Sequence, residues 1–190
     1  MNSSERIRDD LDFVAGVVRQ QERGRGLPTI YFLWAAITLV GFALPDFAPA
    51  AAGPYWFCTG IGGGPLSWWL GARAGRRAGF NDQALGRRYA WHWTLAGVGF
   101  LLAALPLIVG QVPAATGTSA FLLVSGLVYA LAGVHLERQL LYVGCLMLAA
   151  YVVMVIFQPR YVWTITGVVI ALSLIWSGLV AGRSRARAER

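Results

Sequence analysis

Six long apolar stretches recur along this 190-residue chain, and short polar segments separate them. They run over residues 27–44, 54–72, 89–110, 113–136, 140–157 and 161–181. A helix needs about 20 residues to cross a hydrocarbon core roughly 30 Å thick, because each residue rises about 1.5 Å. Each stretch is close to that length. The sequence therefore predicts an all-α, polytopic integral membrane protein with six transmembrane helices.

The composition supports this class of protein. Hydrophobic residues make up 57% of the chain and charged residues only 13%, whereas about a quarter of a soluble domain is charged. The apolar stretches occupy most of the length, so no separate soluble domain is expected. The net charge of +7 comes from 16 arginines, which lie between the apolar stretches. That placement favours membrane orientation, and it argues against nucleic-acid binding.

The arginines also predict the orientation of the chain. Fifteen of them would lie on one side of the membrane: Arg6, Arg8, Arg19, Arg23, Arg25, Arg73, Arg76, Arg77, Arg87, Arg88, Arg138, Arg183, Arg185, Arg187 and Arg190. Only Arg160 would lie on the other side. Basic residues accumulate on the cytoplasmic side, so both termini are expected in the cytoplasm. An even number of spans agrees with this, and a bacterial inner membrane is the expected location.

Three regions are expected along the chain. Residues 1–26 would contain a cytoplasmic amphipathic helix, because Ile7, Leu11, Val14 and Val18 recur at helical spacing. Residues 27–182 would form the six-helix membrane domain, and residues 183–190 a basic cytoplasmic tail. Acidic residues in the N-terminal helix make it a poor match to a lipid-surface helix. Docking on the bundle or on another protein fits this helix better.

The segment Gly60–Pro65 is the most unusual motif. A nucleotide-binding loop is excluded, because a P-loop needs Lys and Ser or Thr after its last glycine, and here Pro65 and Leu66 follow. One interpretation is a packing seam, since small residues let helices approach closely in lipid. The pairs Gly60/Gly64 and Gly71/Gly75 would then face small residues in the fourth and sixth stretches: Ser119, Gly126, Ala130, Gly133, Ser173, Ser177 and Ala181.

The other interpretation is an interrupted helix. Pro65 has no N–H to donate to the carbonyl of Ile61, and broken helices near mid-membrane often form solute sites. The candidate substrate-binding residues in this interpretation are Gly60, Gly62, Gly63, Gly64 and Pro65.

Ionisable groups are missing from the depth of every predicted span. Ion-coupled transporters and pumps usually carry such groups there. The two histidines, His92 and His135, would lie near the cytoplasmic interface of neighbouring helices. They are the only candidates for a metal or a haem, with Glu137 as a third metal ligand, and ordinary interfacial polarity explains them better. We therefore expect no metal, no cofactor and no catalytic residues.

These observations favour a small non-catalytic membrane protein, acting as a subunit or accessory factor of a membrane complex. Its partners would be the lipid bilayer and either another membrane protein or further copies of itself. The alternative is a small permease or channel for a neutral or apolar solute, with its site at the Gly60–Pro65 helix break.

Overall fold

The computed structural model describes residues 11, 26–77, 83–157 and 160–188. These residues form six α-helices and no strand. The helices are α2 (Pro28–Phe47), α3 (Pro49–Arg77), α4 (Gln83–Ile108), α5 (Ala114–His135), α6 (Arg138–Phe157) and α7 (Val162–Ala188). The expected N-terminal helix lies outside the described residues, apart from the exposed, helical Leu11.

Four of the six helices are long and apolar enough to cross a membrane: Pro28–Phe47, Gly86–Ile108, Arg138–Phe157 and Val162–Arg183. A shorter apolar segment, Ser119–His135, lies in α5. Helix α3 has the length but not the apolar composition. The described chain is thus that of an all-helical membrane protein. Each helix overlaps one of the six predicted stretches, and most helix ends lie within a few residues of the predicted bounds.

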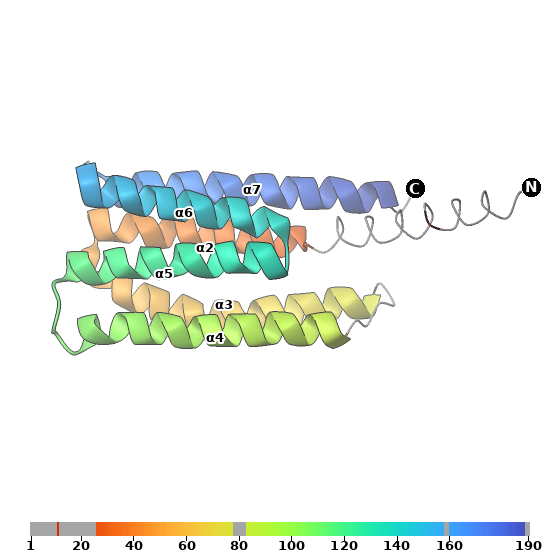
Figure 1. Cartoon of the computed structure of the whole chain (residues 1–190), viewed down its shortest axis with the longest axis horizontal. Helices are drawn as coiled ribbons and strands as arrows, with labels where there is room; N and C mark the ends of the chain where they lie inside the picture. Colours follow the sequence, from red (N-terminus) through yellow and green to blue (C-terminus); the bar gives the residue numbers. More distant parts are fainter. Residues whose placement is uncertain (1–10, 12–25, 78–82, 158–159, 189–190) are drawn as a thin grey trace, which may run out of the picture.

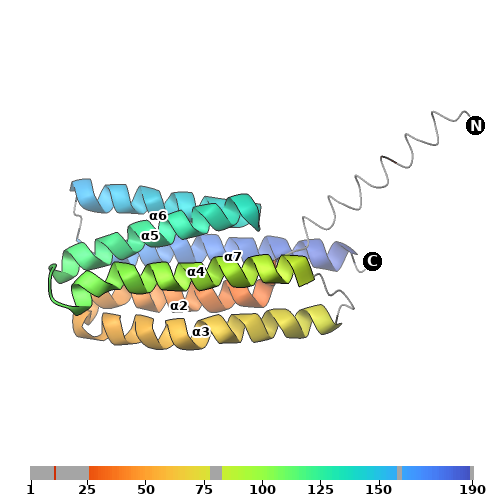
Figure 2. The ribbon, with the colours of Figure 1, turned by 60° about the horizontal axis from the view of Figure 1, so that its bottom comes forward.

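The six helices lie in two layers of three (Figures 1 and 2). One layer is α7–α2–α3 and the other is α6–α5–α4. Successive helices run in opposite directions, so the start of α2 and the end of α7 lie at the same end of the bundle (Figure 1). Helices α3 and α4 share the side of the bundle away from α6 and α7.

The core lies among α2, α5, α6 and α7. Leu122, Val143, Met147, Ile170 and Leu174 are its largest fully buried side chains. The most extensive helix pairs are α2 with α7 and α5 with α6. By contrast, few residues of α3 and α4 are buried. Among those whose exposure is described, only Ala52 and Gly63 of α3 and only Ala96 of α4 are buried. These two helices are therefore peripheral.

Candidate functional site

Glu137 joins three helices at the end of the bundle where the arginines gather. It lies in the two-residue turn between α5 and α6. One carboxylate oxygen accepts a hydrogen bond from the hydroxyl of Tyr31 in α2, and the other accepts one from Tyr89 in α4. Both oxygens of this part-buried acid are thus engaged. Hydrogen bonds to a charged group are among the stronger ones in proteins, so the junction holds α2 and α4 to the α5–α6 turn.

Gly26 shows how tightly this junction is packed. A Cβ atom at this position would lie 2.8 Å from Cε2 of Tyr31 and 2.9 Å from Oε2 of Glu137. Any side chain larger than hydrogen would therefore push the tyrosine or the carboxylate aside. The glycine just before α2 is explained by this close approach.

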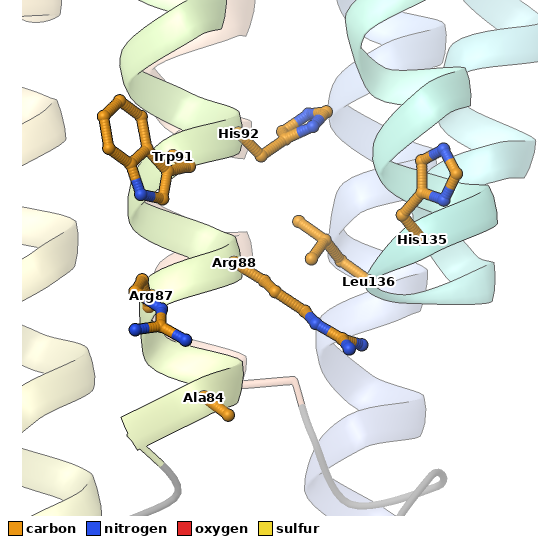
Figure 3. A pocket seen from close by; sticks show the side chains of 7 residues that line it. All are labelled: Ala84, Arg87, Arg88, Trp91, His92, His135 and Leu136. Atoms are coloured by element: carbon orange, nitrogen blue, oxygen red, sulfur yellow. The ribbon is translucent and has the colours of Figure 1, made fainter.

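A cleft of about 450 Å³ opens beside the junction, between the ends of α4 and α5. Its lining residues are Ala84, Arg87, Arg88, Trp91, His92, His135 and Leu136. In Figure 3, His92 reaches from α4 toward α5, His135 lies on the facing helix, and Arg88 extends below them toward α5. Among the described residues, the cleft is therefore lined by two guanidinium groups and two imidazoles, with no acidic side chain.

The two histidines do lie at the same end on neighbouring helices, as the sequence predicts. Glu137, the third ligand considered for them, accepts a tyrosine hydroxyl at each carboxylate oxygen. No group of three metal-ligating side chains is found in the described part of the chain. The ring of His92 packs edge-on against Trp93, with 5.2 Å between ring centroids. Its Nε2 atom is buried without a hydrogen-bond partner among the described residues.

The helix break expected at Gly60–Pro65 is absent. Helix α3 is continuous from Pro49 to Arg77 and contains Pro65 in its interior. Ser67 donates to the carbonyl of Gly63 at 2.7 Å, and Trp34 of α2 donates through Nε1 to Ser67 at 2.9 Å. These contacts support the helix around the proline and hold it to α2.

The candidate glycines of this segment lie in two different environments. Gly63 is buried, and a Cβ atom there would lie 3.4 Å from Trp34 and 3.5 Å from Ile37. Gly60, Gly62 and Gly64 are exposed, and nothing lies within 4 Å of a Cβ atom added to any of them. The seam predicted at Gly60 and Gly64 is thus wrong for the described bundle, because neither residue faces another of the helices α2 to α7.

Close packing occurs instead between α5 and α6. A Cβ atom at Gly133 would lie 2.1 Å from the backbone nitrogen of Leu141. A Cβ atom at Gly144 would lie 2.2 Å from that of Ala130. Gly126 and Gly133, expected to face the second stretch, face α6. The partner glycine in α6, Gly144, escaped the sequence analysis because it is isolated in an otherwise bulky apolar run.

At the opposite end of the bundle, Asp46 joins α2 to α7. Its Oδ2 atom accepts from the backbone N–H of Thr164 at 2.7 Å and from the Thr164 hydroxyl at 2.6 Å. Thr164 lies in the first turn of α7, where backbone N–H groups have no partner within the helix. The sequence does not reveal this contact, because Asp46 and Thr164 are 118 residues apart.

Comparison with known proteins gives no relative: no family model matches the chain, and no curated protein or solved structure shows significant similarity to it.

Proposed function

We propose that this protein is a non-catalytic integral membrane subunit that crosses the bilayer six times and associates through α3 with a second copy of itself. Both termini would lie in the cytoplasm of a bacterial cell, in the inner membrane. The antiparallel order of the six helices supports the even number of spans. The accumulation of Arg73, Arg76, Arg87, Arg88, Arg138 and Arg183 at the end where α2 begins and α7 ends supports the orientation.

The mismatch between the composition and the exposure of α3 carries this proposal. Helix α3 is not among the four long apolar helices, yet only two of its residues are described as buried. A helix that faces lipid along most of its surface should be among the most apolar in the protein, because lipid offers no partner to polar groups. If another protein surface covers α3, its less apolar residues no longer face lipid, and the mismatch is removed.

Pro65 leaves the backbone carbonyl of Ile61 without its helical hydrogen-bond donor on the same exposed surface. Both residues are exposed. Glycines at 60, 62 and 64 leave the backbone of this turn uncovered by side chains. Backbone polar groups that face lipid without a partner are costly. A neighbouring helix that packs closely here would remove this part of α3 from lipid.

A second copy of the chain is the occupant that fits best. Gly60 and Gly64 are four residues apart and therefore lie on one flank of α3, open to the outside. This spacing supports close crossing of two identical helices. In a two-fold dimer, the same flank meets itself, so one exposed surface supplies both halves of the interface. The chain already uses such close approaches between α5 and α6.

The test compares three proteins in lipid bilayers: wild type, Gly60→Leu/Gly64→Leu, and Gly62→Leu. Gly62 is equally open but lies on another flank, since two residues turn a helix by about 200°. Single-molecule photobleaching of a C-terminal fluorescent label counts the copies. We expect dimers for wild type and Gly62→Leu and monomers for the double variant. Monomeric wild type, or equal loss of dimers in both variants, would refute the proposed interface.

A further inference from the structure

The cleft between α4 and α5 concentrates positive charge that has no acidic partner in the described part of the chain. Arg87 and Arg88 are exposed and line the cleft together with His92 and His135. Only two acidic residues are described. Asp46 is bonded to Thr164 at the other end of the bundle, and the carboxylate of Glu137 is bonded by two tyrosines.

Tyr31 and Tyr89 occupy the carboxylate of Glu137 beside the cleft. Glu137 directly follows the lining residues His135 and Leu136 in the sequence, so of the two described acids it is the one placed to neutralise the arginines. With both oxygens accepting hydroxyl hydrogens, neither is directed to a guanidinium group. The two arginines keep their donors for another anion.

The hydrogen-bond donors of the cleft fit a phosphate group. A guanidinium group presents several N–H donors in a planar fork that matches phosphate oxygens. The exposed imidazole of His135 adds hydrogen-bonding capacity at the same cleft. Its volume of about 450 Å³ lies within the range typical of small-molecule sites. Leu136 and Ala84 provide apolar wall that suits the glycerol and proximal chains of a lipid.

We propose that this cleft binds the phosphate group of an anionic ligand, either the headgroup of a phospholipid or free phosphate. The guanidinium groups of Arg87 and Arg88 carry the binding, and the exposed His135 lies in the same cleft. This proposal is independent of the α3 interface, because the cleft is formed by α4 and α5.

The test uses the full-length protein in a neutral detergent and two short-chain probes, dioctanoyl phosphatidylglycerol and dioctanoylglycerol, which lacks phosphate. Native mass spectrometry measures how many molecules remain bound and at what concentration. The variant Arg87→Gln/Arg88→Gln removes the two charges that line the cleft. The control Arg76→Gln/Arg183→Gln removes two charges from exposed arginines at the same end, on α3 and α7.

We expect one tightly bound phosphatidylglycerol per chain and at least about tenfold weaker binding in Arg87→Gln/Arg88→Gln, since two charged hydrogen-bond partners are lost. The control variant should bind as the wild type does. If the double variant is poorly produced, each single variant is measured, and both must weaken binding. Equal weakening in the control pair, equal binding of dioctanoylglycerol, or unchanged binding after loss of both cleft arginines would overturn the proposal.

Inorganic phosphate then distinguishes the two sources of the anion. Displacement of phosphatidylglycerol by millimolar phosphate, but not by chloride at the same ionic strength, assigns the cleft to free phosphate as well as to lipid. Retention of phosphatidylglycerol under the same conditions assigns it to the lipid headgroup.

Discussion

The hydroxyl of Tyr31 donates a hydrogen bond to the carboxylate of Glu137, 106 residues further along the chain. This contact joins the first helix of the described bundle to the turn between α5 and α6. Together with the bond from Tyr89, it engages both oxygens of the acid at the edge of the bundle, beside the basic cleft.

Replacing Tyr31 with phenylalanine should destabilise the bundle by about 1.5–3 kcal/mol, because a hydrogen bond to a charged, part-buried group is lost. Thermal unfolding in detergent should show a midpoint lowered by several degrees. Tyr142→Phe is the matched control, since Tyr142 is 64% exposed on α6. If the two variants melt at the same temperature, the Tyr31–Glu137 contact does not stabilise the protein.

Gly133→Ala should destabilise the bundle strongly, by about 1–3 kcal/mol or more, because its methyl group would overlap the backbone of Leu141. Gly64→Ala makes the same chemical change where nothing lies within 4 Å. It should leave the stability of the monomer unchanged or slightly higher, since alanine favours helix over glycine. Both melting midpoints are measured in detergent. A larger loss in Gly64→Ala would contradict the placement of α3 at the periphery.

Asp46→Ala should weaken the attachment of α2 to α7, because it removes the acceptor for the N–H and the hydroxyl of Thr164. Loss of a comparable cap costs about 0.5–2 kcal/mol. Asp46→Asn keeps one acceptor oxygen and should fall between Ala and wild type. Thermal unfolding of all three proteins checks the order. Identical midpoints would show that this contact has no net effect on stability.

Reporter fusions test the topology. A reporter active only in the cytoplasm should work when fused at the C-terminus and should be inactive after Ala48, Gln111 or Arg160, which lie between helices at the other end. A reporter that requires export should show the reverse pattern. Activity of the cytoplasmic reporter at Ala48, with silence at the C-terminus, would reverse the proposed orientation.

The sequence by itself determined the class of the protein and most helix positions. The fifth stretch, predicted over residues 140–157, is α6 at Arg138–Phe157. The fourth, predicted over 113–136, is α5 at Ala114–His135. Such segments can be located from the sequence because the length and apolarity needed to cross a membrane are properties of one continuous run of residues. The arginines could be assigned to one side because they lie in the short segments between these runs.

Tertiary structure decided which of the small residues pack and which polar residues meet. Helical spacing places Gly60 and Gly64 on one flank of α3, just as it places Gly126 and Gly133 on α5, but only the second pair meets another helix of this chain. Periodicity defines which residues share a face, and the neighbour of that face depends on how the helices are arranged. The same reason hid the contacts of Glu137 with Tyr31 and Tyr89, which exist only because α2 and α4 meet the α5–α6 turn at one end of the bundle.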